Sequence, residues 1–336
     1  MQITLKDIAR MADVAESTVS RALNNKPGVG EDTKLKIIKI AKKHNYRPNQ
    51  LARGLAANKT NMIAVILSEM DSPGNIEIVK SLEKAAEKNG YQIILCNTNN
   101  QTEKEKSYLT LLESNQVDGA IFIGGKLVEG HLLRASFSPD NNIVLINRLA
   151  EEIFFTSVLT DYSQGVYKAV GHLLDQGFEN IALVGGENYN LIEEEKSAGY
   201  KAALIDHGYQ INEDLIFSIK ADRKSGYNVF LEIIEGDIIP DAFISTSELT
   251  TIGLVEAIKM GGYFIPDDFA VVGYGDNILT SVIDPPLTVL SEPVDALADY
   301  SFDFLLKLIN KKMKDQQIKV LTPELIIRES SISKYN

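Results

Sequence analysis

From residue 61 onward the chain alternates short apolar runs with amphipathic segments, and this alternation restricts the fold more than any other feature. The apolar runs read as buried strands, at residues 62–67, 91–95, 119–123 and 143–146 in a first series and 181–184, 242–245 and 270–273 in a second. The segments between them predict helices that end near residue 90 or lie near 102–114, 193–207, 223–235 and 248–260. Continuous Val, Ile and Leu strands separated by helices predict parallel sheets covered on both faces. We therefore expect an α/β core of two similar, doubly wound subdomains.

Residues 4–46 follow a different pattern, in which two short helices precede a longer basic one. Steps of three and four residues predict the first helix, whose apolar stripe consists of Leu5, Ile8, Ala9 and Ala12. Thr4 can cap this helix, and Asp7 can complete a capping box with its carboxylate at the positive end of the helix dipole.

A turn at Val14 leads to the second short helix, which a turn-forming cluster at residues 24–28 must end. Its outward positions would be free to meet base edges and phosphates; they are Glu16, Ser17, Ser20 and Arg21. These two helices predict a helix-turn-helix that reads DNA. We expect a third helix at residues 31–44, with a packing side made of Leu35, Ile38, Ala41 and Lys42.

The charge distribution supports this prediction. Residues 1–60 contain 12 Lys and Arg against 5 Asp and Glu, a net charge of +7. The remaining residues contain 22 Lys and Arg against 41 Asp and Glu, a net charge of −19. A cationic head on an acidic body is expected when one end of a protein meets a polyanion and the other must avoid it.

Several other classes of protein are disfavoured. No apolar run approaches membrane-spanning length and the N-terminus has no secretory segment, so we expect a cytoplasmic protein. Cys96 is the only cysteine, which excludes an intrachain disulfide. The four histidines lack metal-ligand spacing, and no G-x-S-x-G elbow or Walker A loop occurs. We predict no enzymatic activity, no cofactor and no metal, and we interpret the three glutamates at 193–195 as a solvated helix start.

Short motifs occur in a characteristic order along the chain. They are Leu5-Lys6-Asp7-Ile8-Ala9, Ser17-Thr18-Val19-Ser20-Arg21, Tyr46-Arg47-Pro48-Asn49, Leu51-Ala52-Arg53-Gly54-Leu55, Val117-Asp118-Gly119, Gly199-Tyr200, Ile265-Pro266-Asp267-Asp268, Val272-Gly273-Tyr274 and Pro286-Leu287-Thr288. Each motif is short, but their order and separations together resemble the LacI/GalR family of bacterial transcription regulators over essentially all 336 residues.

The resemblance implies roles for residues of the head. Glu16 and Ser17 match the family's variable base-reading positions, and Arg21 matches an arginine that reaches a base or the nearby backbone. Further DNA contacts are expected at phosphates or in the grooves, from Thr4, Thr18, Ser20, Asn24, Arg47, Asn49 and Arg53. Ala15 departs from the family pattern, in which a serine caps the second helix. Because loss of a cap costs about 1 kcal/mol, we expect Asp13 or DNA phosphates to compensate.

Residues 49–57 resemble the family's hinge helix, which is too short to be stable alone in water. It would order only when two copies pack together on operator DNA. Leu55 matches the residue that wedges between base pairs in the minor groove and kinks the duplex, and Arg53 lies beside it. The alternative interpretation of Leu51 and Leu55 is an ordinary packing pair.

The resemblance also implies a core like that of periplasmic sugar-binding proteins, with chain crossings near 160–161, 291–292 and 321–322. We predict a helix-turn-helix domain at 1–46, a hinge helix and linker at 47–60, an N-terminal core subdomain at 61–160 with 292–321, and a C-terminal core subdomain at 161–291 with 322–336. An effector cleft is expected between the subdomains at the carboxyl ends of the strands.

Positions that match the family's effector contacts are Asp71, Ser72, Gly74, Asn147, Arg148, Asp161, Lys196, Glu248 and Tyr274. Several depart from the common pattern. Lys196 stands where an arginine is usual, Ser247-Glu248 where Asn-Asp is common, and Gly275 where an aspartate is frequent. The ligand could therefore be a sugar-like or other polar metabolite, an unusual ligand, a protein partner, or none.

These observations predict a homodimeric, sequence-specific transcription regulator, most simply a repressor, that binds a pseudo-palindromic operator in double-stranded DNA and responds to a small, sugar-like effector. The alternatives are a solute-binding protein of the same core fold without DNA function, and a regulator controlled by a protein partner.

Catabolite-control relatives bind a phosphorylated carrier protein. Segment 276–285, which we match to their contact region on the first subdomain, contains no Lys or Arg, so we do not expect this chain to bind such a carrier.

Overall fold

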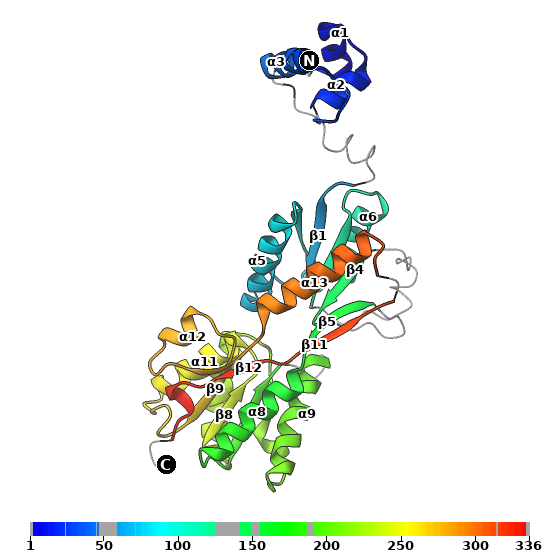
Figure 1. Ribbon diagram of the computed structural model, residues 1–336. Helices are drawn as coiled ribbons and strands as arrows, with labels where there is room; N and C mark the ends of the chain where they lie inside the picture. The colour runs from blue at the N-terminus through cyan, green and yellow to red at the C-terminus, as the bar shows by residue number, and fades with distance from the viewer. Residues whose placement is uncertain are drawn as a thin grey trace. The chain divides into compact units, whose positions relative to one another are not determined.

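The structure is a computed structural model that describes residues 3–23, 25–44, 46, 59–70, 72–124, 142–148, 155–186, 191–313 and 315–333 (Figure 1). The chain divides into two compact units, Met1–Asn61 and Met62–Asn336. Each unit is described by itself.

The first unit is a head of three helices, α1 (Leu5–Ala12), α2 (Glu16–Leu23) and α3 (Glu31–Lys43). They share one small core made of Ile8, Ala9, Ala12, Val19, Ala22, Ile37 and Ala41. The helices predicted from the sequence are confirmed. Because α1 and α2 each contain 8 residues, neither would be stable alone, and their packing against α3 stabilises all three.

The predicted packing side of α3 is partly wrong. Leu35 is 62% exposed and Lys42 is also exposed, whereas Ile37 is fully buried. Isoleucines occupy positions 37, 38 and 40, so the apolar spacing alone allows more than one face to point inward. Contact with α1 and α2 selects the face through Ile37 and Ala41.

The second unit contains two six-stranded sheets. The first has the order β11-β5-β4-β3-β1-β2 and consists of β1 (Met62–Leu67), β2 (Gln92–Asn97), β3 (Gly119–Ile123), β4 (Ile143–Ile146), β5 (Thr156–Thr160) and β11 (Ile318–Leu321). The second has the order β12-β10-β9-β8-β6-β7 and consists of β6 (Ile181–Gly185), β7 (Ile216–Ser218), β8 (Ala242–Ser245), β9 (Ala270–Tyr274), β10 (Thr288–Ser291) and β12 (Glu324–Ile326). Neighbouring strands are parallel except for β10 and β12. The predicted fold class is confirmed.

Helices cover both faces of each sheet (Figure 1). In the first sheet, α5 (Pro73–Lys88) and α13 (Val294–Ile309) pack on one face and α6 (Thr102–Glu113) on the other. Alternate residues of β1 point to opposite faces of the sheet. Ile63, Val65 and Leu67 pack on the α5 side, and Ala64 and Ile66 pack on the α6 side. Burial on both faces is the physical reason for the continuous apolar runs in the sequence.

The second sheet is covered in the same way. The helices α8 (Tyr162–Asp175) and α9 (Leu191–Asp206) pack on one face, and α10 (Arg223–Ile234) and α11 (Glu248–Met260) pack on the other. Short 3-10 helices at η1 (Glu213–Leu215) and η2 (Glu329–Ser331) complete this half.

The chain passes between the two sheets three times in this topology. It leaves the first sheet after β5, returns after β10 when α13 packs on the first sheet, and leaves again between β11 and β12. The carboxyl ends of β5, β9 and β10 therefore lie next to the connections between the sheets.

The short helix α12 (Ile278–Val282) connects β9 to β10, so residues 276–285 belong with the second sheet. Our match of this segment to a contact region on the first subdomain is therefore wrong. Its lack of Lys and Arg carries no information about a partner of the first subdomain.

Glycines allow the closest approaches between helices. A Cβ atom on Gly199 of α9 would lie 2.1 Å from the carbonyl oxygen of Ser163 on α8. A Cβ atom on Gly253 of α11 would lie 1.9 Å from the carbonyl oxygen of Arg223, where α10 begins. Any side chain at these positions would force the helices apart.

We predict that Gly199→Ala destabilises the second unit, because the added methyl group overlaps a backbone oxygen and overpacking costs about 1–3 kcal/mol. Gly171→Ala on α8 is a matched control, since its Cβ atom would lie 3.5 Å from the ring of His207. In a helix this control should be neutral or stabilising by up to about 1 kcal/mol. Urea unfolding followed by circular dichroism separates the two variants, and equal midpoints would contradict the close approach of α8 and α9.

Candidate DNA-binding and effector sites

The N-terminus of α1 is held by the predicted capping box. The N–H of Asp7 donates to Oγ1 of Thr4 at 3.3 Å, and Oδ2 of Asp7 accepts from the N–H of Thr4 at 3.0 Å and from its hydroxyl at 2.6 Å. The hydrogen bonds from the Thr4 side chain and backbone lower the pKa of Asp7. Thr4 thus fixes the start of α1, and its predicted DNA contact stays a prediction.

Residues on the outer side of α2 are available to a partner. Glu16, Ser17 and Arg21 are exposed, and Thr18 and Ser20 are half-buried. Val19 and Ala22 hold the opposite side of the helix in the core of the head. An α-helix with one side anchored and one side open has the form needed to enter a major groove.

The α2 helix begins without a side-chain cap at Ala15. The carbonyl oxygen of Ala15 accepts from the N–H groups of Thr18 and Val19, at 2.9 and 3.2 Å. Asp13 adopts a left-handed conformation at the end of α1, and no bond from its side chain to α2 occurs among the described residues. Compensation by the charge of Asp13 or by DNA phosphates therefore stays a prediction.

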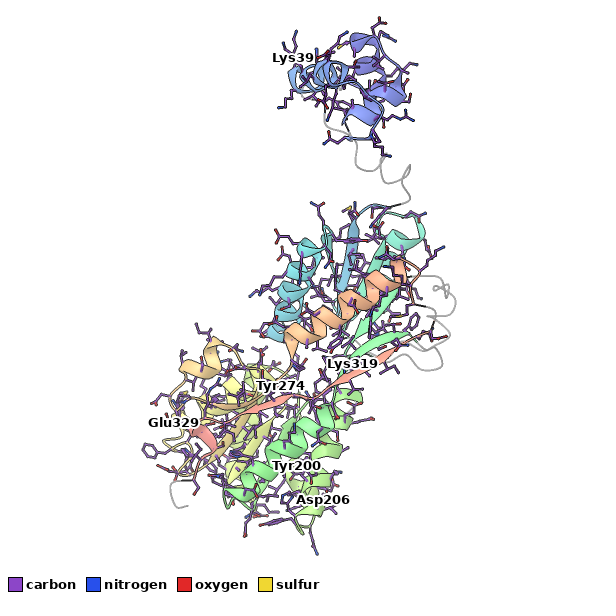
Figure 2. All side chains as sticks on the ribbon, viewed as in Figure 1. Lys39, Tyr200, Asp206, Tyr274, Lys319 and Glu329 are labelled. Carbon is purple, nitrogen blue, oxygen red and sulfur yellow. The ribbon has the colours of Figure 1, made fainter. Side chains whose placement is uncertain are left out.

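The remaining DNA contacts lie outside the described residues. They are Asn24, Arg47, Asn49, Arg53 and Leu55, and the whole predicted hinge helix at 49–57 also lies outside these residues. Figure 2 shows Lys39 on α3, one of the exposed lysines that give the head its positive charge.

The first three predicted effector residues follow β1. Asp71 lies outside the described residues. Ser72 is at the N-cap position of α5, is half-buried and makes no capping bond with its side chain. Gly74, in the first turn of α5, has open space around the position of a Cβ atom.

Arg148, which follows β4, already forms an ion pair with a carboxylate of the protein. Its Nη1 and Nη2 atoms donate to Oε1 and Oε2 of Glu105 on α6, at 2.7 and 3.0 Å. The side chains of Arg148 and Glu105 are 3% and 12% exposed. A bidentate, buried pair of this kind leaves Arg148 little capacity to bind a ligand anion.

Glu292, at the crossing from β10 to α13, gathers hydrogen bonds from both sheets. Its Oε1 accepts from the hydroxyl groups of Tyr274 and Tyr162 at 2.6 and 3.1 Å, and its Oε2 accepts from Nδ2 of Asn147 and Oγ1 of Thr160 at 3.0 and 3.4 Å. Burial, together with the negative charge of Glu292, raises the pKa of Tyr162 and of Tyr274 well above the usual pKa of a tyrosine. Both phenols therefore remain donors. Figure 2 shows Tyr274 at the end of β9.

Lys196 on α9 is also committed to internal partners. Its Nζ donates to Oε1 of Glu193 and to the carbonyl oxygen of Thr246, each at 2.8 Å. The same ammonium group lies 5.1 Å from the ring centre of Tyr162 and 4.5 Å from that of Tyr274. The side chain is 6% exposed, so Lys196 is enclosed by an ion pair, a carbonyl group and two aromatic rings.

Glu193 contradicts our interpretation of residues 193–195 as a solvated helix start. Its side chain is 13% exposed, and its Oε2 accepts from the N–H of Gly186 at 2.9 Å and from Oγ1 of Thr246 at 2.7 Å. Burial favours a raised pKa for Glu193, but the charge of Lys196 and these hydrogen bonds outweigh burial and lower it. Glu194 and Glu195 are exposed, as expected.

Asp161 caps a helix. Its side chain accepts the N–H of Gln164 at 2.9 Å at the start of α8, and the residue is half-buried. One carboxylate oxygen is therefore used to position α8.

Glu248 is the first residue of α11 and one of the predicted effector residues. Its side chain has a buried oxygen atom that makes no hydrogen bond within the described part of the chain. The residue is 8% exposed, and the atom without a partner is Oε2. A Cβ atom on Gly275 would lie 1.9 Å from Oε1 of Glu248. Glu248 thus fills the space that a side chain at 275 would need, and Gly275 has a φ of +82°, which suits glycine. The glutamate at 248 and the glycine at 275 therefore form one structural feature.

The electrostatic surroundings of Glu248 disfavour its charged form. Burial is the main cause, and the negative charges of Glu77 and Glu292 add to it, against an opposing effect of the Asn277 side chain. Together these effects raise the pKa of Glu248 to about 7. The group therefore changes charge near neutral pH.

Sequence reasoning missed the partners that bind the predicted residues, namely Glu105, Tyr162, Glu193, Thr246 and Glu292, and the repelling neighbour Glu77. The spacing of Glu193 and Lys196 at i and i+3 is a signal that could have revealed one pair. Glu105 and Arg148 are 43 residues apart, and no local pattern connects them.

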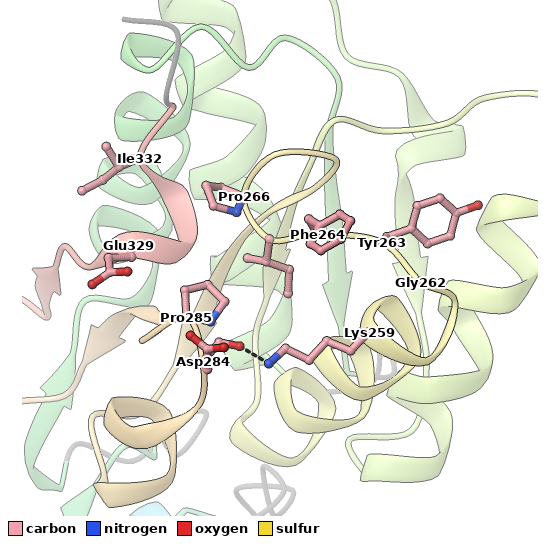
Figure 3. Close-up of a pocket in the computed structure, with 10 residues that line it drawn as sticks. Lys259, Gly262, Tyr263, Phe264, Pro266, Asp284, Pro285, Glu329 and Ile332 are labelled. Carbon is pink, nitrogen blue, oxygen red and sulfur yellow. Dashed lines mark hydrogen bonds between the residues drawn. The ribbon is translucent and has the colours of Figure 1, made fainter.

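A separate cavity of about 590 Å³ lies elsewhere in the second half of the core (Figure 3). It is lined by Lys259, Gly262, Tyr263, Phe264, Ile265, Pro266, Asp284, Pro285, Glu329 and Ile332. None of the predicted effector residues belongs to this lining. The ammonium group of Lys259 donates to the carbonyl oxygen of Asp284, so this cation is used within the cavity wall.

Within the described ranges, no group of three His, Cys, Asp or Glu side chains is arranged to hold a metal ion. The helices of the same ranges are all too short or too polar to span a bilayer.

Comparisons with known proteins identify the class of this protein. The model of bacterial regulatory proteins, lacI family, matches residues 4–49, and the model of a periplasmic binding protein-like domain matches residues 170–331. The HTH-type transcriptional regulator RegA of Clostridium saccharobutylicum is 32% identical over 333 residues, which cover 99% of this chain and 100% of RegA. Catabolite control protein A of Priestia megaterium is also 32% identical over 333 residues, covering 98% of this chain and 100% of that protein.

A solved structure has the same fold over nearly its whole length. The lac repressor dimer bound to operator and the anti-inducer ONPF aligns with a TM-score of 0.89 at 23% identity, covering 99% of this chain and 100% of that one. The protein belongs to the lacI family of bacterial regulatory proteins. It is a transcription regulator with a helix-turn-helix head and an effector-binding core, and it is not an enzyme. The predicted family, function class and lack of enzymatic activity are confirmed.

We predict that Glu248→Gln stabilises the protein at pH 8 by about 2 kcal/mol and has little effect at pH 4. A raised carboxyl pKa means that the folded state holds its proton more tightly than the unfolded state. The stability from Glu248 is therefore present below the usual pKa of a glutamate and is lost as the pH rises through about 7. Urea unfolding of both proteins between pH 4 and 8 measures the difference. A constant difference across this range would show that Glu248 does not titrate near neutrality.

Proposed function

We propose that this regulator is a homodimeric repressor that binds a pseudo-palindromic operator and is controlled by a small ligand, sugar-like or a related polar metabolite. The observation that carries the proposal is the open side of α2, with Glu16, Ser17 and Arg21 exposed on a head that the lacI family model matches. The lac repressor is bound to operator as a dimer in the similar structure. A protein that acts on chromosomal DNA works in the bacterial cytoplasm, where we place this one.

The DNA-binding role rests on how the head presents its residues. Glu16, Ser17 and Arg21 would read base edges, and Thr4, Thr18 and Ser20 would position the head on phosphates. We propose that residues 47–60 form the hinge and linker, with Leu55 inserted in the central minor groove of the operator.

The effector-binding role rests on the polar groups at the carboxyl ends of the strands. In doubly wound sheets this edge carries the ligand site. We propose that the ligand contacts residues of both subdomains, which we limit to 61–160 with 292–321 and 161–291 with 322–336. A ligand that binds the operator-competent and incompetent arrangements unequally would change operator affinity.

The test of operator recognition uses the full-length chain and fragments of its own upstream region. The protein should bind one fragment far more tightly than random DNA of equal length, as measured by fluorescence anisotropy at a fixed salt concentration. Arg21→Ala should relax the preference at one base pair of each half-site, costing about 1–3 kcal/mol for the matched sequence. A uniform loss over all sequences would mark Arg21 as a phosphate contact, and equal binding of wild type to random DNA would remove the regulator proposal.

A second prediction concerns the hinge. Leu55→Ala should weaken specific binding by about 2 kcal/mol and reduce bending of the operator, because the wedge that unstacks the central step is lost. Gel mobility of circularly permuted operator fragments measures the bend. Leu51→Ala is the matched control on the same segment, and bending unchanged by Leu55→Ala would show that Leu55 is an ordinary packing residue.

A further inference from the structure

The carboxylate of Glu248 is a buried polar group that lacks a partner. The residue is 8% exposed, and its Oε2 accepts no hydrogen bond from the part of the chain that the structure describes. An unsatisfied buried acceptor is costly, and a buried carboxylate is more so. A folded protein retains such a group when something else supplies the missing donor.

The charges around Glu248 are mainly negative. Glu77 from α5 and Glu292 from the β10–α13 connection both act on it electrostatically. Lys80 acts on Glu77, and Asp276, which also acts on Glu77, is paired with Arg328. The side chain of Asn277 acts on Glu248 in the opposite sense and lowers its pKa. The described groups that face Glu248 therefore include no cation bound to it.

The two cations predicted for ligand binding cannot balance these carboxylates. Arg148 is held by both oxygens of Glu105, and Lys196 is held by Glu193 and the carbonyl oxygen of Thr246. Glu292 accepts four hydrogen bonds, so its own charge is already solvated by donors of the protein. Among the described residues at this edge, Glu248 has a buried carboxylate oxygen without a hydrogen-bond partner.

A second acidic group lies at the same edge. Glu195 on α9 is exposed, and partial desolvation together with the charge of Asp161 at the start of α8 raises its pKa. The site thus presents carboxylates from α8, α9 and α11, while its lysine and arginine are neutralised internally. These carboxylates would repel an anionic ligand, and a neutral hydroxyl compound would gain hydrogen bonds but no charge pairing.

We propose that the effector of this regulator is an organic cation whose ammonium group binds the carboxylate of Glu248. This inference rests on the proposed function, since it names the class of ligand for the same effector site. The ammonium group donates the hydrogen bond that Oε2 lacks, balances the charge of Glu248 and reduces its repulsion from Glu77 and Glu292. An ammonium ligand that also carries hydroxyl groups, such as an amino sugar, suits the hydrogen-bonding groups nearby.

Matched probes test this proposal on the full-length protein. Glucosamine, galactosamine and putrescine are compared with glucose, galactose and 1,4-butanediol at equal concentration and constant ionic strength, with melting temperature as the first readout. At least one amine should raise the melting temperature by several degrees while its neutral counterpart leaves it unchanged. Isothermal titration then gives the affinity, which should rise between pH 6 and 7.5 for putrescine as Glu248 loses its proton.

The isosteric variant Glu248→Gln assigns the effect to one carboxylate. It should weaken binding of the amine at least tenfold and remove the pH dependence, whereas Glu232→Gln, on the exposed side of α10, should change neither. Circular dichroism confirms that both variants are folded.

Three results would overturn the proposal. They are the absence of a shift with every amine, a larger shift with a neutral probe or with glucose 6-phosphate, and amine binding that survives unchanged in Glu248→Gln. Operator binding by the wild-type protein is measured in parallel. If operator binding holds while the amines fail, only the ligand class is wrong, and if operator binding fails, the proposed function is wrong whatever the amines do.

Discussion

The carboxylate of Glu292 joins residues of the two sheets, and the arrangement of the candidate effector site depends on it. Asn147 and Thr160 donate to it from the ends of β4 and β5, and Tyr162 and Tyr274 donate to it from the second half of the core. A buried network of this kind is stable only when its members are all satisfied. Because both oxygens of the ion are used, the strand ends it connects are held in one geometry, and the polar groups beside them are positioned by it.

Ion pairs within the protein determine which charged side chains remain able to bind a ligand. Arg148 and Lys196 look like anion-binding groups in the sequence, but Glu105 and Glu193 neutralise them. Glu248 remains unpartnered, and its contact with Gly275 explains why position 275 has no side chain. Positions 248 and 275 look independent along the chain but are coupled in space.

The head and the core divide the work of a regulator between them. The head carries the positive charge and a helix with one open side, and its small core of seven buried residues holds that helix in place. The core carries the negative charge and a polar edge on each sheet. A core with both sheet faces buried has few other places for polar side chains, which concentrates candidate ligand contacts at the strand ends.

The sequence by itself determines the local structure and the distribution of charge. The strand and helix runs, the Thr4–Asp7 capping box and the charge difference between head and core depend on residues close together in the chain, where periodicity and capping rules apply. Only the tertiary structure decided that α3 buries Ile37 and exposes Leu35, that Glu105 neutralises Arg148, and that Glu248 lacks a partner. Burial and long-range ion pairing depend on which distant segments pack together, and a pattern of neighbouring residues contains no record of that packing.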